Sequence, residues 1–187
     1  PVVGETLVTT SLRLREAWQR FRSRFWLALL FDAAMIMAVF LAIHAWQTRD
    51  LPIDQAAPET VLALLDGSGI RSAVEPGQAG IIYFMAPWCF YCRTSIDNLQ
   101  NLVDDGEVNW GTVVALDYGD IEEVQIFIDE TGVTLPVLMG NAQTAADWQI
   151  RAFPTYYVVD ANGEIHSRSV GYSTLAGMWF RSWLSSL

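Results

Sequence analysis

The chain has 187 residues, of which 52% are hydrophobic, and a formal net charge of −10 at pH 7. Its length accommodates one domain of ordinary size and an additional segment. It contains no lysine, and from Leu51 onward five arginines stand against seventeen carboxylates, a charge of about −12. Because a surface this acidic repels a phosphate backbone, nucleic acid is excluded as an expected partner.

The N-terminal region predicts a membrane anchor. Residues 1–24 contain five arginines and two glutamates, and residues 25–46 form an apolar run whose only strongly polar members are Asp32 and His44. As a helix this run would be about 33 Å long, enough to cross a hydrocarbon core of about 30 Å. Because the arginines precede the span, the positive-inside rule predicts a cytoplasmic tail at 1–24, a single-pass transmembrane anchor at 25–46 in the inner membrane, and a periplasmic remainder.

Two features of this region leave alternatives. A cleavable signal peptide is one, but the apolar run is long for a signal peptide and lacks a suitable pair of small residues near its end. Asp32 is the other, because a carboxylate about 10 Å into the span is unfavourable and often functional. Since there is one helix and no second charge to receive a proton, we expect Asp32 to snorkel, to be protonated or to face a partner helix.

Residues 47–58 hold two prolines among acidic residues and are expected to form a polar linker to a domain at 59–187. Apolar periodicity and turn residues predict the elements of this domain. Strands are expected at 61–65, 70–71, 81–85, 113–116, 135–138, 155–159 and 165–169, and helices from 90 to about 103 and at 121–130, 144–149 and 174–187. This order predicts an α/β sandwich with a mixed central sheet.

Two of these helices have a predicted inner face. In the helix at 121–130, Ile121, Val124 and Ile128 are expected to point inward. The six carboxylates between Asp117 and Glu130 are expected to form a solvated face, with a docking patch as the alternative. In the closing helix, the residues at four-residue spacing are expected to pack on the sheet, with a membrane-surface role for the tryptophans as the alternative; they are Leu175, Trp179, Trp183 and Leu187, with Phe180 and Leu184 beside them.

Cys89 and Cys92 lie between the strand at 81–85 and the following helix. A helix N-terminus concentrates unpaired N–H groups and the positive end of the helix dipole, both of which favour a thiolate. Cys89 is therefore the expected nucleophile. Cys92, three residues further on the same helical face, can resolve a mixed disulfide by intramolecular attack.

Zinc binding and a purely structural disulfide are the alternatives for this pair. A zinc site needs about four ligands, and the chain offers no other cysteine and only two histidines, His44 and His166, far along the sequence. A disulfide closing so short a loop constrains the unfolded chain little. Redox chemistry is therefore the favoured interpretation, with no metal and no cofactor expected.

The segment Ala86-Pro87-Trp88-Cys89-Phe90-Tyr91-Cys92, followed by Phe153-Pro154-Thr155 and then Val158 to Ile165, resembles the thioredoxin superfamily. With the anchor and the additional segment at 118–138, the chain is similar to the TlpA, ResA and DsbE group of membrane-tethered proteins. Tyr83 and the segment 171–179 resemble the ScsD branch of that group, which is linked to suppression of copper sensitivity.

The resemblance implies a thioredoxin-like three-layer sandwich in which Pro154 is cis and faces the cysteines. Phe153 would pair through its backbone with an extended substrate segment, and Trp88, Phe90, Tyr91 and Thr155 would shape the site. A trans proline opening a strand is the alternative. Tyr83 stands where thioredoxin has a buried aspartate as proton acceptor. The dipeptide Phe90-Tyr91 between the cysteines does not predict the redox potential, because it is neither the histidine-containing pair of strong oxidants nor the glycine-proline of thioredoxin.

We therefore expect a membrane-anchored periplasmic thiol-disulfide oxidoreductase that reduces or isomerises disulfides of substrate proteins. In an oxidising compartment such a protein needs a transmembrane electron donor. One alternative is a copper-handling protein that binds Cu(I) through both thiolates with help from Met85 or Met139. Another is an apocytochrome c thiol reductase, disfavoured because no acidic residue stands between the cysteines.

Overall fold

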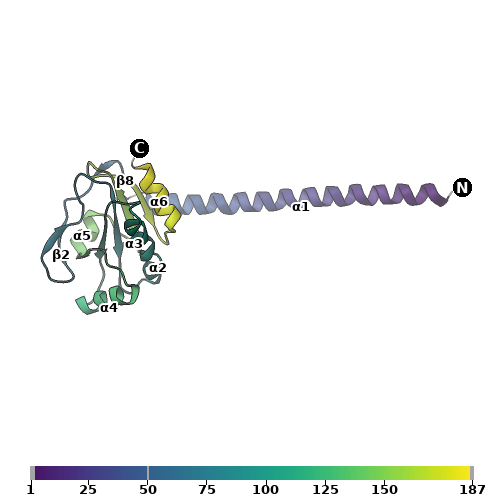
Figure 1. Ribbon diagram of the computed structural model, residues 1–187. Coiled ribbons are helices and arrows are strands. Elements are labelled where there is room, and N and C mark those ends of the chain that lie inside the picture. The colour runs from purple at the N-terminus through teal and green to yellow at the C-terminus, as the bar shows by residue number, and fades with distance from the viewer. Residues whose placement is uncertain (1–2, 50, 186–187) are drawn as a thin grey trace. The chain divides into compact units, whose positions relative to one another are not determined.

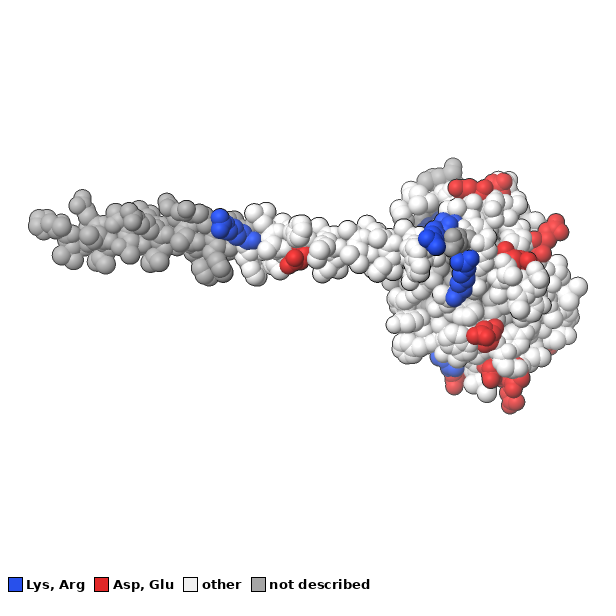
Figure 2. All heavy atoms as spheres, turned by 180° about the vertical axis from the view of Figure 1, so that it is seen from behind, with Lys and Arg blue, Asp and Glu red and all other residues white. Residues whose placement is uncertain are grey.

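The computed structural model describes residues 3–49 and 51–185, with side chains described from Arg24 onward. The chain divides into two compact units, Pro1–Trp46 and Gln47–Leu187. Helix α1 (Val3–Thr48) forms the described part of the first unit, and its last two residues belong to the second. Its section Arg24–Thr48 is long and apolar enough to cross a membrane, and its charged residues are Arg24 and Asp32 (Figure 2). The predicted span 25–46 lies within this section.

The second unit is built on one mixed sheet with the strand order β1-β8-β7-β4-β5-β6-β2-β3. β4, β5 and β6 run parallel to one another, and the other pairings are antiparallel. The strands are β1 (Gln55–Ala56), β2 (Val61–Leu64), β3 (Ile70–Ser72), β4 (Gly80–Met85), β5 (Gly111–Ala115), β6 (Val137–Met139), β7 (Thr155–Val159) and β8 (Glu164–Val170).

Helices cover both faces of the sheet (Figure 1). The sheet has an apolar core on each face, and each core must be covered. β4 is buried throughout, and its side chains alternate between the two cores. Tyr83 belongs to the core under α3, α4 and α6, and Phe84 to the core under α5. The helices are α2 (Phe90–Arg93), α3 (Ile96–Asp104), α4 (Ile121–Thr131), α5 (Ala142–Asp147) and α6 (Leu175–Leu184). The predicted three-layer thioredoxin-like sandwich is confirmed.

The predicted continuous helix from 90 to 103 is wrong, because α2 ends at Arg93 and α3 begins at Ile96. Thr94 and Ser95 interrupt it. Their hydroxyls donate to the Tyr91 carbonyl at 3.2 and 2.7 Å, respectively. Hydroxyl groups that bond to the preceding turn in this way compete with the regular helical hydrogen bonds.

Ser95 has a second partner that ties the break to the sheet. Its hydroxyl lies 2.8 Å from the Tyr83 hydroxyl, and both residues are fully buried. Because Ser95 uses its proton on the Tyr91 carbonyl, Tyr83 is the donor to Ser95. This buried pair holds the end of α2 against β4.

The predicted linker 47–58 is incorporated in the globular unit over much of its length. Leu51 is buried in the second core, and Gln55 pairs with Ile165 at the edge of the sheet. The two prolines, Pro52 and Pro58, flank β1 rather than interrupt it, which is where an edge strand tolerates proline. The backbone of β8 gains hydrogen-bond partners that a free tether would not supply.

Smaller differences have local causes. α5 begins two residues earlier than expected because the Asn141 side chain caps it by accepting from the N–H groups of Gln143 and Thr144. In α4, Phe127 rather than Ile121 joins Val124 in the core, and Ile121 is exposed. Gly132 ends α4 in the left-handed conformation with φ of 69°, as its position predicts.

The inner face predicted for the closing helix is wrong. α6 is present, but Met178 and Ser182 face the core, whereas Trp179 and Trp183 are 38% and 45% exposed. α6 contacts α3, and Met178 joins the apolar side chains of α3 in one core cluster. Residues 186–187 of the predicted helix lie outside the described residues, as do residues 1–2 of the predicted tail.

We predict that Gly80→Ala destabilises the globular unit by about 1–3 kcal/mol, the usual result of overpacking a core. A Cβ at this position would fall on the indole ring of Trp110, which is buried and donates through Nε1 to the Gln78 carbonyl at 2.9 Å. Denaturant unfolding of the full chain in detergent, followed by circular dichroism, measures the change. Gly119→Ala is the matched control, because its new methyl group would meet only the flexible Glu123 carboxylate. Equal stability of the two variants would contradict the prediction.

We predict that Ser95→Ala destabilises the oxidised protein by about 1–3 kcal/mol, because the buried Tyr83 hydroxyl loses its partner. Adding Tyr83→Phe should recover part of that loss, because the unpaired hydroxyl is then removed. The same unfolding titration, performed on both single variants and the double variant, gives the coupling energy. Additive effects would show that the two hydroxyls do not stabilise each other.

Candidate active site

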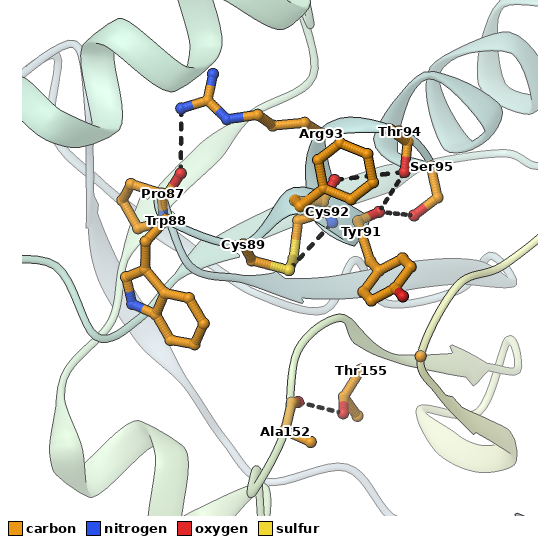
Figure 3. Close-up of a disulfide and its surroundings, with 12 residues drawn as sticks. Pro87, Trp88, Cys89, Tyr91, Cys92, Arg93, Thr94, Ser95, Ala152 and Thr155 are labelled. Carbon is orange, nitrogen blue, oxygen red and sulfur yellow. Dashed lines mark hydrogen bonds between the residues drawn. A yellow bond between two sulfur atoms is a disulfide. The ribbon is translucent and has the colours of Figure 1, made fainter.

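The two cysteines lie where β4 is followed by α2, as predicted. β4 ends at Met85, the Cys89 N–H donates to the Ala86 carbonyl at 3.0 Å, and α2 begins at Phe90. Cys89 and Cys92 form a disulfide with Cα atoms 5.2 Å apart (Figure 3). The two residues are therefore close enough for reversible thiol–disulfide exchange.

The two sulfur atoms have different surroundings. Cys89 is the N-cap of α2, and its Sγ accepts a hydrogen bond from the Cys92 N–H at 3.1 Å. Once the disulfide is opened, this bond stabilises a Cys89 thiolate more than a thiol. Cys89 is 4% exposed and Cys92 is fully buried. An incoming sulfur atom therefore reaches Cys89 first, in keeping with the roles predicted for the two cysteines.

Trp88 is held in place beside the disulfide. Its indole Nε1 donates to both the carbonyl and the Oδ2 of Asp117, each at 3.1 Å. Its ring also contacts Phe153, with centroids 5.8 Å apart and planes at 82°. Asp117 has a φ of 50°, which brings its carbonyl and its carboxylate to the same donor. The exposed ring of Trp88 thus has a defined orientation.

Phe90 and Tyr91 complete the aromatic surround of the disulfide. Their rings contact each other at 5.7 Å, and both side chains are exposed. Figure 3 shows Trp88 and Tyr91 on opposite sides of the sulfur atoms, both directed toward the segment that carries Ala152 and Thr155. We call Trp88, Phe90 and Tyr91 the site aromatics; each is exposed and adjacent in sequence to one of the two cysteines.

The Phe153–Pro154 peptide bond is cis, as the resemblance implied. β7 begins directly after it, and Thr155 pairs with Phe84 near the end of β4, so this segment lies at the same edge of the sheet as the cysteines. The Thr155 hydroxyl donates to the Ala152 carbonyl at 2.8 Å. The Gly171 N–H donates to the Pro154 carbonyl at 2.8 Å. These bonds position Phe153 against Trp88.

Tyr83 lies in the core that also contains Cys92. Burial raises the pKa of Tyr83, so the phenol keeps its proton at neutral pH. Tyr83 is therefore unsuited to the proton-accepting role of the aspartate that thioredoxin has at this position. It acts here as a buried donor to Ser95.

Sequence reasoning missed two residues that position the site. Asp117 orients Trp88, and Arg93 connects the cysteine segment to α4. The Arg93 side chain donates to the Pro87 carbonyl at 3.2 Å, forms an ion pair with Glu130 and lies 5.1 Å from the Phe127 ring centroid. The acidic run at 117–130, predicted as a solvated face, thus supplies two site contacts. Asp117 follows β5, which is parallel to β4. Because parallel neighbouring strands end at the same edge of a sheet, the position of Asp117 just after a predicted strand was the signal in the sequence that could have placed it near the cysteines.

A cavity of about 570 Å³ opens beside the two residues that contact Trp88. It is lined by Asp117 and Phe153 together with Tyr118, Gly140 and Arg151. A second cavity of about 420 Å³, between the β2–β3 hairpin and α4, contains no predicted site residue. Within residues 24–49 and 51–185, no group of three or more His, Cys, Asp or Glu side chains is arranged to hold a metal ion.

Known proteins share this sequence pattern and fold. YneN, a thioredoxin-like protein of Bacillus subtilis, is 28% identical over 124 residues, covering 64% of this chain and 72% of its own. The thiol-disulfide oxidoreductase ResA of Oceanobacillus iheyensis is 27% identical over 162 residues, covering 83% and 84%. A thiol:disulfide interchange protein of the thioredoxin family from Chlorobium tepidum superposes with a TM-score of 0.62 at 22% identity, covering 70% of this chain and 95% of that one.

ResA is a thiol-disulfide oxidoreductase, the Chlorobium tepidum protein belongs to the thioredoxin family, and YneN is thioredoxin-like. This chain carries a Cys-x-x-Cys disulfide between β4 and α2. The model of the AhpC/TSA family matches residues 53–168, which include β1 and most of β8. The matched segment contains both cysteines and the cis-proline. The chain therefore belongs to the AhpC/TSA family, with a thioredoxin-like fold.

Proposed function

We propose that this protein is a membrane-anchored periplasmic oxidoreductase that reduces disulfide bonds of substrate proteins through Cys89 and Cys92. The observation that carries the proposal is the disulfide itself, which lies at the N-terminus of α2 beside Trp88 and the cis-proline segment. The section Arg24–Thr48 of α1 supports the anchor, and the arginines before it support a cytoplasmic N-terminus.

The proposed reaction transfers two electrons to the substrate. The Cys89 thiolate attacks one sulfur atom of a substrate disulfide, forming a mixed disulfide and releasing the other substrate sulfur as a thiolate. Cys92, after losing its proton, attacks Cys89 Sγ. The second substrate sulfur then leaves, and the Cys89–Cys92 disulfide of this structure re-forms. Both substrate sulfurs are reduced, and the protein is oxidised.

The surroundings of the disulfide support an extended polypeptide as substrate. The site aromatics offer apolar contact area. Phe153, ahead of the cis-proline, is placed to pair through its backbone with a substrate strand. The neighbouring cavity of about 570 Å³ can accept a side chain that flanks the substrate cysteine.

Regeneration of the dithiol requires a reductant, because the periplasm is oxidising. We infer that a transmembrane electron donor supplies the electrons, since the proposed anchor keeps the protein in the membrane plane with such a donor. The two residues between the cysteines, Phe90 and Tyr91, are exposed aromatic residues and do not by themselves predict the reduction potential of the disulfide. A redox titration would measure it.

Membership of the ScsD branch is part of the proposal and is supported by Tyr83 and the segment 171–179. A specific observation also favours Cu(I) binding as a second candidate. Met85 belongs to the same core cluster as both cysteines and the half-buried Met139 packs against that cluster, so two thioethers share this core with the thiols of the reduced protein. Stoichiometric retention of copper by the reduced protein, without turnover of disulfide substrates, would favour this candidate over the reductase.

We predict that Cys92→Ser accumulates a mixed disulfide between Cys89 and a substrate protein, because the resolving thiol is missing. Turnover should fall on the order of a hundredfold or more, since an intramolecular attack is lost. Non-reducing electrophoresis with mass spectrometry detects the adduct, and a coupled thiol assay measures turnover. Cys89→Ser is the control and should form no adduct. An adduct on Cys92 in that control, or full activity of either variant, would contradict the proposal.

We predict that alkaline phosphatase fused after residue 187 is active in cells, because that enzyme requires the disulfides formed only outside the cytoplasm. The same reporter fused after residue 24, ahead of the apolar section, should be inactive. Phosphatase activity in intact cells is the measurement. The reverse pattern would place the globular unit in the cytoplasm.

A further inference from the structure

Helix α6 presents an exposed aromatic face. Its exposed apolar residues are 38% to 51% accessible, while Met178 and Ser182 on the opposite side are buried. Trp183 stacks on both Trp179 and Phe180, with ring centroids 6.3 and 6.2 Å away. We call this surface the α6 face; it consists of Leu175, Trp179, Phe180, Trp183 and Leu184.

Chain length keeps the globular unit close to the end of the proposed span. The apolar run ends at Trp46, and Leu51 is already buried in the core of the second unit. Five residues of extended chain reach at most about 18 Å. A protein anchored through residues 25–46 therefore has its globular unit within reach of the lipid headgroups.

Charge distribution separates the α6 face from the rest of this unit. Asp and Glu side chains are spread over the visible surface of the globular unit in Figure 2, and seventeen carboxylates lie between Asp54 and Glu164. From Ile165 to Leu187 there is none, while Arg168 and Arg181 are present. The helix that α6 packs against, α3, carries Asp97 and Asp104, and Glu107 after it accepts from Trp179 Nε1 at 2.8 Å. The five side chains of the α6 face are themselves uncharged, so contact with a bilayer would depend on apolar and aromatic groups and not on charge attraction.

We propose that the α6 face lies on the lipid bilayer at the level of the headgroups. Tryptophan favours this position because its ring is apolar and its N–H is polar. The face is one helix wide, about 15 Å by roughly 10 Å, which is far smaller than the roughly 800 Å² per partner of a stable protein interface. The bilayer therefore fits this face better than a second copy of the chain does. The inference rests on the proposed membrane anchor and not on the thiol chemistry.

The test uses the full chain with Cys89→Ser and Cys92→Ser, which removes both of its cysteines. Single cysteines are introduced by Ala176→Cys, Met37→Cys or Gln125→Cys and labelled with an environment-sensitive fluorophore. Ala176 is exposed among the residues of the α6 face, Met37 lies in the apolar section of α1, and Gln125 is exposed on α4. The proteins are placed in nanodiscs of phosphatidylethanolamine and phosphatidylglycerol, some with a nitroxide quencher on the headgroup.

We expect blue-shifted emission from the labels at 37 and 176 and water-like emission from the label at 125. Headgroup nitroxides should quench the label at 176 more strongly than the label at 125. Adding Trp179→Ser and Phe180→Ser, two exposed positions, should move the emission of the label at 176 back toward that of the label at 125.

Three results would overturn the inference. A water-like label at 176 beside a bilayer-embedded label at 37 would leave the anchor intact and remove the α6 contact. A blue shift at 176 without headgroup quenching would assign the face to a protein partner or a second copy. A water-like label at 37 would remove the anchor and the inference together. None of these readouts depends on whether the protein reduces disulfides.

Discussion

The hydrogen bonding of β4 to β5 on one side and to β7 on the other determines where chemistry takes place in this fold. Because β4 and β5 are parallel and β7 is antiparallel, the ends of the first two strands meet the beginning of the third at one edge. Three segments distant in sequence converge there: the cysteine loop, Asp117 and Phe153-Pro154. A disruption of this pairing would separate the disulfide from the residues that surround it.

Beneath that edge, the site is supported by polar contacts rather than by apolar packing alone. The Tyr83–Ser95 bond holds the end of α2 from the core side, and Arg93 holds it from the surface through Pro87 and Glu130. A four-residue helix has little stability of its own. Its orientation, and with it the position of the Cys89 sulfur atom, therefore depends on these contacts with neighbouring elements.

The order of elements could be predicted because each leaves a local pattern, such as the apolar run of β4 or the glycine that ends α4. The cis-proline was accessible only through the family resemblance. Periodicity showed that the closing helix has an apolar face but not what covers it, so the inner face of α6 was misassigned. The break at Ser95 depends on Tyr83 in another element, and β1 exists only because β8 offers an edge, neither of which leaves a local signal.

Because Cys92 is buried, its thiol needs a proton acceptor, and the residues around it do not provide one. In the proposed reaction this thiol must lose its proton before it attacks Cys89, and an apolar environment disfavours the resulting thiolate. Tyr83 cannot accept the proton because burial raises the pKa of its phenol, which therefore already carries a proton at neutral pH, and the Ser95 hydroxyl donates to the Tyr91 carbonyl. Cys89, at 4% exposure, is the point where the sulfur pair reaches the surface. In the proposed reaction, the shortest route for this proton therefore runs past Cys89, where the substrate thiolate released in the first step can accept it.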